Sequence, residues 1–87
     1  MAEKFKMNKY FGVKDSKGEK VILGSLLICP SHKPETYGYG PYEIYWDEYS
    51  SSYNMKNINN QDSYPILTYR RQNGDLVLSQ DYLVITK

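Results

Sequence analysis

The chain has 87 residues, which allow one small domain and exclude a two-domain dinucleotide enzyme, a TIM barrel and a kinase. Its 11 Lys and Arg residues nearly balance 10 acids, which counts against a general nucleic-acid binder, since such proteins are usually strongly basic. A single cysteine, Cys29, excludes an internal disulfide. With a charged N-terminus and no long apolar run, this free thiol predicts a cytoplasmic protein without a membrane partner. We expect residues 1–87 to form one domain, with residues 1–8 as a flexible tail.

Short strands joined by tight turns are predicted along the first third of the chain, and a single alanine argues against helices. Residues 9–13 and 19–23 are the arms of a predicted hairpin, and the cluster Asp15-Ser16-Lys17-Gly18 supplies its turn. Gly24-Ser25 interrupts the pattern, after which residues 26–29 predict a buried strand that ends before a proline.

The middle of the chain predicts a loop, an aromatic strand and a second loop. Residues 30–41 hold three prolines and two glycines, which favour a loop of fixed shape. Residues 42–49 alternate as a strand with one core face and one solvent face. The residues assigned to the core face are Tyr42, Ile44 and Trp46. Residues 50–63 are polar and rich in Asn and Ser, and they predict a long loop with at most a short helical turn.

The last third predicts a hairpin followed by a terminal strand. Residues 64–71 alternate as a strand, Asn73-Gly74 is a strong hairpin signal, and residues 76–78 form the returning arm. Residues 82–86 predict the last strand. Five to six short strands of this kind predict an all-β fold, either a small SH3-like barrel or a rolled antiparallel sheet with the two long loops described above.

Two segments resemble a known family. Residues 10–27, with the sequence YFGVKDSKGEKVILGSLL, resemble the TGLKDKNGKEIYEGDIV segment of YopX-like phage proteins. Residues 42–47, YEIYWD, are similar to the YEIVWDE strand that often follows it there. The chain departs from the family pattern at Ser25, which replaces an acid, and in the insertion at residues 30–41. Over roughly residues 10–49, the resemblance implies an SH3-like barrel encoded by a phage or prophage, and it brings no established catalytic residues.

Few residue patterns suggest catalysis or metal binding. His32 is the single histidine and follows Cys29 by three positions, which supplies two of the four ligands of a structural zinc. A site shared by two subunits would complete the set, but a buried Cys29 and a surface His32 are the simpler interpretation. Glu43, Asp47 and Glu48 are interpreted as solvated acids, and no phosphate-binding loop motif occurs. We therefore expect a non-catalytic protein with no cofactor and no metal.

Tyrosine is unusually frequent, with 10 in the chain, and seven aromatic residues fall between positions 37 and 53. Since only nineteen residues are Ile, Leu, Val or Phe, some rings are needed in the core, and both a contact surface and simple packing stay open. The predicted contact surface lies on and beside the glycine-rich loop and consists of Tyr37, Tyr39, Tyr45 and Tyr49. Arg70 and Arg71 are adjacent on a strand and are candidate phosphate ligands, with a local ion pair as the alternative for each.

Charge is unevenly distributed along the chain. Residues 1–20 carry six lysines and three acids, a net charge of +3, whereas residues 35–62 carry five acids and one lysine, a net charge of −4. These segments are either solvated faces or complementary surfaces that would join subunits of a homo-oligomer or bind a basic host protein.

Three functions are compatible with these features. The first is a non-catalytic phage-type protein that inhibits or modulates a host component, such as an anti-phage defence protein, through a tyrosine-rich surface. The second is an oligomeric sponge that sequesters a nucleotide second messenger between tyrosines and an arginine. The third is a nucleic-acid-binding small barrel, against which the near-neutral charge and the acidic middle both count. It would use Lys4, Lys6, Lys9, Lys14, Lys17 and Lys20.

Overall fold

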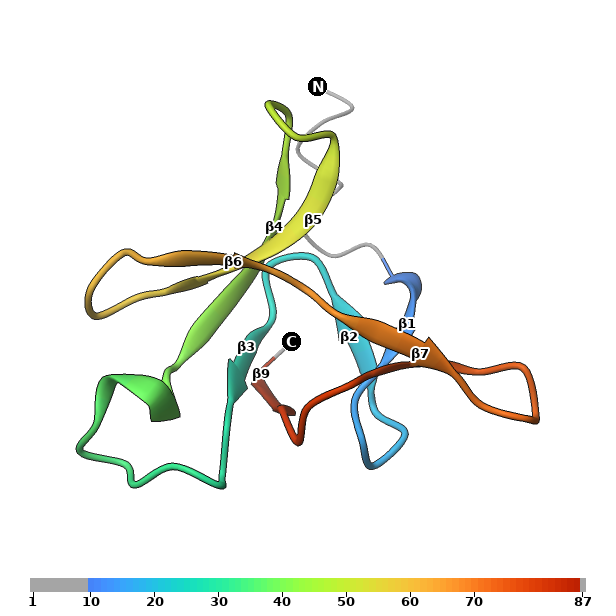
Figure 1. The fold of residues 1–87 in the computed structure, drawn as a ribbon, viewed down its shortest axis with the longest axis horizontal. Coiled ribbons are helices and arrows are strands. Elements are labelled where there is room, and N and C mark those ends of the chain that lie inside the picture. The colour runs from blue at the N-terminus through green and yellow to red at the C-terminus, as the bar shows by residue number, and fades with distance from the viewer. Residues whose placement is uncertain (1–9, 87) are drawn as a thin grey trace.

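The structure is a computed structural model that describes residues 10–86, and in this part of the chain the regular elements are β-strands and one short turn (Figure 1). The turn is the 3-10 helix η2 (Tyr37–Tyr39). The strands of the described part are β1 (Tyr10–Lys14), β2 (Lys20–Ile22), β3 (Leu26–Ile28), β4 (Tyr42–Asp47), β5 (Ser52–Asn57), β6 (Ser63–Pro65), β7 (Thr68–Arg70), β8 (Leu76–Leu78) and β9 (Leu83–Thr86). The predicted tail at residues 1–8 lies outside the described residues.

The strands form two sheets, with the orders β2-β1-β8-β7 and β6-β5-β4-β3-β9. The β1–β8 pair is parallel, and the other pairs are antiparallel. The predicted all-β fold of the rolled-sheet kind is therefore confirmed, although the sheets do not close into a barrel. The described residues form nine strands instead of five to six, since β5 lies in a predicted loop and β6 and β7 replace one predicted strand.

The first predicted hairpin is present as β1 and β2, and the carboxylate of Asp15 organises its turn. Asp15 is 2% exposed, and its Oδ1 accepts the backbone N–H groups of Lys17 at 2.9 Å and Glu19 at 2.8 Å. Its Oδ2 accepts the N–H of Val84 in β9 at 3.0 Å. Because β1 and β9 belong to different sheets, this single carboxylate joins the two sheets.

The predicted interruption at Gly24-Ser25 is the corner at which the chain passes from the first sheet to the second. Gly24 has φ of +90°, a conformation that glycine adopts at little cost. Ser25 is completely buried, and its Oγ accepts the N–H of Ile22 at 3.1 Å. Its carbonyl accepts the N–H of Ile44 at 3.1 Å, so the corner is fastened directly to β4. The serine that replaces the acid of the resembled motif is thus a buried structural residue.

The prediction of a loop over residues 50–63 is wrong, because β5 lies within it. β5 pairs with β4 along six successive residue pairs. Met55 and Asn57 are buried, although the segment is polar overall. Asn57 is tolerated there because its Oδ1 accepts the backbone N–H groups of Asn59 at 2.8 Å and Asn60 at 3.2 Å. A buried asparagine with satisfied hydrogen bonds therefore occupies a place that the polar composition assigned to solvent.

The single strand predicted over residues 64–71 is split into two. β6 pairs with β5 in the second sheet, and β7 pairs with β8 in the first. We call residues 63–70 the strap, since this segment crosses from one sheet to the other in Figure 1. Its two central residues, Ile66 and Leu67, pair with neither sheet as strand residues. The predicted hairpin with Asn73-Gly74 at its turn is confirmed as β7 and β8.

The hydrophobic core contains Tyr42 and Ile44, as predicted, but not Trp46. Trp46 is 37% exposed and packs edge-on against Tyr53, with ring centroids 4.8 Å apart. Trp46 lies near the tip of the β4–β5 hairpin, which extends away from the other described strands in Figure 1. The buried cluster consists of Val13, Val21, Leu23, Leu27, Cys29, Tyr42, Ile44, Met55 and Leu78.

Candidate functional site

Two apolar grooves lie beside the strap. The first, here called the inter-sheet groove, has a volume of about 260 Å³ and includes Ile66 in its wall. The second, here called the tyrosine groove, has a volume of about 230 Å³ and includes the next residue, Leu67. Successive side chains of an extended chain point to opposite sides, so the strap contributes to both grooves with adjacent residues.

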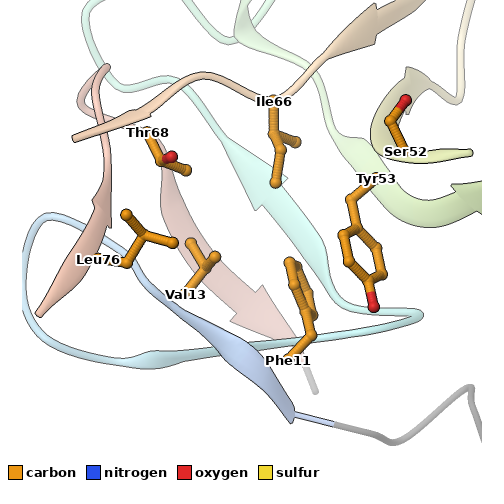
Figure 2. A pocket seen from close by; sticks show the side chains of 7 residues that line it. All are labelled: Phe11, Val13, Ser52, Tyr53, Ile66, Thr68 and Leu76. Carbon is orange, nitrogen blue, oxygen red and sulfur yellow. The ribbon is translucent and has the colours of Figure 1, made fainter. Parts of the chain in front are cut away.

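The inter-sheet groove opens between β1, β5, β8 and the strap, and Figure 2 shows Phe11, Ile66 and Leu76 pointing into the space between them. The residues that line it are Phe11, Val13, Ser52, Tyr53, Ile66, Thr68 and Leu76. Apolar atoms dominate this surface, because the polar atoms of its lining side chains are limited to three hydroxyl groups. The groove can therefore take an apolar group. The Ser52 hydroxyl at its edge already donates to Asn54 Oδ1 at 3.2 Å.

A continuous aromatic cluster forms one wall of the inter-sheet groove. Phe11 of β1 stacks on Tyr53 of β5 with ring centroids 4.1 Å apart and an interplanar angle of 23°. Trp46 of β4 meets the same tyrosine edge-on at 4.8 Å. The cluster leads from the groove toward the hairpin tip, where Tyr49 is fully exposed. Large rigid rings in such an arrangement offer contact area with little loss of side-chain entropy on binding.

The four tyrosines predicted to form one contact surface do not lie together. Tyr37 and Tyr39 share the η2 turn, which precedes β4, whereas Tyr49 follows β4 in the hairpin tip at its other end. Tyr45 lies within β4, and its hydroxyl donates to Ser63 Oγ at 3.1 Å. The length of an intervening six-residue strand, about 20 Å, separates the η2 tyrosines from Tyr49.

The two arginines lie on the β7–β8 hairpin, far from the η2 turn in Figure 1. Arg70 Nη1 donates to the carbonyl of Gly74 at 2.9 Å, and Arg71 Nη2 donates to the carbonyl of Ser16 at 3.4 Å. Both guanidinium groups therefore donate to carbonyls of turn residues. The structure does not place either arginine with the predicted tyrosines.

Cys29 is buried, as predicted, and its thiol donates to Asp81 Oδ1 at 3.2 Å. Burial raises the pKa of this thiol above its ordinary value, and the nearby carboxylate acts in the same direction. A raised pKa disfavours the nucleophilic thiolate at neutral pH. His32 is exposed and packs against Gly38 instead of joining a catalytic arrangement with the thiol. Within residues 10–86, no three His, Cys, Asp or Glu side chains gather where they could hold a metal ion.

The sequence did not indicate Phe11, Ile66 or Leu76 as site residues. They come from β1, the strap and β8, and are separated by long stretches of chain. The signal available in advance was the apolar character of these residues in short strands, which is equally typical of core residues.

No protein-family model matches the chain, and neither a curated protein nor a solved structure is significantly similar to it. The resemblance to YopX-like phage proteins therefore stays a prediction. No helix among residues 10–86 is long and apolar enough to cross a bilayer.

Proposed function

We propose that this protein is a non-catalytic binding domain that inhibits or modulates a partner protein, and that the inter-sheet groove accepts an apolar side chain of that partner. The observation that carries the proposal is the open groove with the stacked pair Phe11 and Tyr53 in its wall. Pre-formed apolar pockets beside exposed aromatic rings are typical of the central contacts of protein interfaces.

The size of the groove favours a side chain over a whole nucleotide ligand. Its volume of about 260 Å³ is smaller than the roughly 300–1,000 Å³ of sites that enclose drug-sized molecules. A single Leu, Met or Phe side chain fits such a space, whereas a cyclic dinucleotide is much larger.

The chemistry of the groove favours binding over catalysis. Among the described residues that line it, the one ionisable group is the phenol of Tyr53, and the lining provides no carboxylate, imidazole, amine or thiol. A general acid or base must lie within hydrogen-bond reach of its substrate. Ser52 and Thr68 hydroxyls without such a base suit recognition of a partner and not proton transfer.

The partner class that we propose is a bacterial host protein, and the cytosol is the proposed compartment. The resemblance of residues 10–27 to YopX-like phage proteins supports a phage origin. The buried free thiol of Cys29 suits a reducing environment. The nucleotide sponge and the nucleic-acid barrel have less support, since the arginines lie apart from the predicted tyrosines and the charge of the chain is close to neutral.

The decisive experiment fills the groove without truncating the core. Thr68→Phe adds a ring at an exposed position that lines the groove, and Gln72→Phe adds the same ring in the β7–β8 turn. A photo-crosslinking residue at position 68 identifies the partner in a bacterial lysate, and the purified partner is then titrated against the wild-type chain and both variants. We expect Thr68→Phe to weaken binding by about tenfold or more, the loss expected for a central contact, and Gln72→Phe to leave it unchanged.

Equal affinity of both variants for the purified partner would refute the groove as the binding site. A thermal shift of the wild-type chain with cyclic di- or oligonucleotides would instead support the sponge. Circular dichroism of both variants establishes that they are folded before affinities are compared.

A further inference from the structure

The tyrosine groove is a second concave surface, which the proposed function does not use. The residues that line it are Met55, Tyr64, Pro65, Leu67, Gln80 and Tyr82. Met55 is buried at its floor, whereas Tyr64 is 42% exposed and Leu67 is 59% exposed. Two large apolar side chains are thus held in contact with water at the rim, as at surfaces that bind a partner.

The aromatic walls of the tyrosine groove are fixed by a buried ring. Tyr42 packs edge-on against Tyr82, with centroids 5.5 Å apart, and against Tyr64, with centroids 6.2 Å apart. The hydroxyl of Tyr42 donates to the carbonyl of Gly38 at 2.9 Å, which holds this central ring in place. The groove is therefore pre-formed, and binding to it costs little ordering of its walls.

Two exposed carboxylates accompany these walls. Asp62 Oδ2 accepts the hydroxyl of Tyr64 at 3.5 Å, and Asp81 lies in the chain between the lining residues Gln80 and Tyr82. Asp81 Oδ1 accepts hydrogen bonds from the thiol of Cys29 and the hydroxyl of Ser31. All of these donors are neutral, and within residues 10–86 the structure gives neither carboxylate an ion pair. Two carboxylates without a described cationic partner therefore lie next to lining residues of the groove.

We propose that the tyrosine groove binds a lysine or arginine side chain from a basic segment of a partner protein. The aliphatic stem of such a side chain packs against Leu67, Met55 and the tyrosine rings, and its charged end reaches Asp62 or Asp81. Tyrosine faces add cation–π attraction for the same group. An uncharged apolar side chain would leave the carboxylates unused, and an acidic segment would be repelled by them.

This inference is independent of the inter-sheet groove, and its test uses peptides instead of the unidentified partner. The full ¹⁵N-labelled chain is titrated with three peptides that share a Gly-Ser frame and carry Lys-Leu-Lys, Glu-Leu-Glu or norleucine-Leu-norleucine. The salt concentration is kept at about 50 mM, at which surface charges are only partly screened. We expect the lysine peptide to shift the amide signals of Leu67, Gln80 and Tyr82, and the other two to bind at least about fivefold more weakly.

Matched charge variants separate the carboxylates from general attraction. Asp62→Asn and Asp81→Asn remove the charge but keep an oxygen that accepts the existing hydrogen bonds. Together they should weaken the lysine peptide about tenfold, whereas Glu48→Gln, in the turn at the other end of β5, should leave its affinity unchanged. Thr68→Phe should also have no effect, because position 68 lines the other groove.

Several results would overturn the inference. These are equal binding of the acidic peptide, no shift of the groove amides by the lysine peptide, and the same loss with Glu48→Gln as with the two aspartate variants. Shifts at the groove that appear with protein concentration alone would assign the groove to a second copy of the chain. If Thr68→Phe weakens binding of the purified partner but leaves binding of the lysine peptide unchanged, the two grooves act independently and each proposal is supported separately.

Discussion

Replacing Asp15 is predicted to be among the most damaging single changes in the chain. The side chain is 2% exposed and accepts three backbone hydrogen bonds, from Lys17 and Glu19 in its own turn and from Val84 in the other sheet. Asp15→Ala removes both acceptor oxygens, and with them all three hydrogen bonds, and leaves a small cavity. Asp15→Asn keeps one oxygen for the turn but turns an NH₂ group toward the N–H of Val84, so that two donors face each other.

The size of the expected loss in unfolding free energy depends on how exposed the three backbone N–H donors are. A hydrogen bond to a charged group contributes about 1.5–3 kcal/mol, and a buried donor left without an acceptor costs about 1–3 kcal/mol. Lys17 is exposed, so its N–H can regain water after the substitution, whereas Glu19 and Val84 are both half-buried and regain water less readily. We therefore expect a loss of about 3–5 kcal/mol for Asp15→Ala and about 2 kcal/mol for Asp15→Asn. Small domains have a total stability of about 5–15 kcal/mol, so the alanine variant should be close to unfolding.

Urea unfolding followed by the fluorescence of Trp46, the single tryptophan, measures these losses. Asp47→Ala is the matched control, since Asp47 also accepts three hydrogen bonds, from Tyr49, Ser50 and Asn54, but in the exposed hairpin tip. Its loss should be below about 1 kcal/mol, because water replaces the lost partners. A loss below about 1 kcal/mol for Asp15→Ala, or an asparagine variant less stable than the alanine variant, would refute the inter-sheet role of the carboxylate.

Three further predictions concern the backbone and the buried ionisable groups. Gly40→Ala should lower the free energy of unfolding in urea by more than about 2 kcal/mol, because φ is +107° and the new Cβ would lie 2.9 Å from the Tyr42 ring. Gly74→Ala, where φ is +97° but the new Cβ meets open space, should lower it by about 1 kcal/mol. Equal losses for the two variants would contradict this reasoning. The thiol of Cys29 should react with a disulfide reagent far more slowly in the folded chain than in guanidinium at pH 8, because burial raises its pKa; equal rates would contradict its burial. Burial raises the pKa of Tyr82 from 10.0 to about 12, so its neutral form stabilises the fold below pH 10 and this contribution is lost as pH rises through about 12. Unfolding free energies at pH 9 and pH 11 should consequently fall more for the wild-type chain than for Tyr82→Phe, and parallel losses would refute this.

The parts of the fold that could be predicted depend on local chemistry. Asp15 to Gly18 and Asn73-Gly74 supply turns whose backbone conformations few other residues adopt, and both hairpins are present. Gly24-Ser25 marks the corner between the sheets for the same reason. In each case the information lies within a few neighbouring residues, and the tertiary structure only reinforces it.

The elements that escaped prediction depend on contacts that are distant in sequence. β5 contains Ser52, Asn54 and Asn57, which are residue types typical of loops. It is nevertheless a strand, because β4 on one side and β6 on the other form hydrogen bonds with its backbone. Residues 64–71 alternate regularly in sequence, but the strap changes its pairing partner at Ile66 and Leu67. Nothing within the segment itself identifies the residue at which one sheet is exchanged for the other.

The predicted tyrosine surface is dispersed in the structure for a related reason. Tyrosines that are close in sequence were expected to be close in space, but β4 is extended and separates Tyr37 from Tyr49 by its whole length. The stacked pair in the wall of the inter-sheet groove joins Phe11 to Tyr53, which are forty-two positions apart. Residues that are close in sequence stay close in space on a helix, whereas an extended strand spreads them along its length and onto both of its faces.

The shortage of aliphatic residues explains both the tyrosine-containing core and the open grooves. Only nineteen Ile, Leu, Val and Phe residues are present to fill the core between two sheets. At the centre of the second sheet, the buried position is occupied by Tyr42 and not by an aliphatic residue. A tyrosine must direct its hydroxyl to a partner, as Tyr42 does toward Gly38, so it cannot fill space as freely as leucine does. The rings around it consequently meet edge-on, and the strap crosses above incompletely filled space. The same composition that requires aromatic residues inside the domain therefore leaves an apolar groove on each side of the strap, where a side chain from a partner can complete the packing.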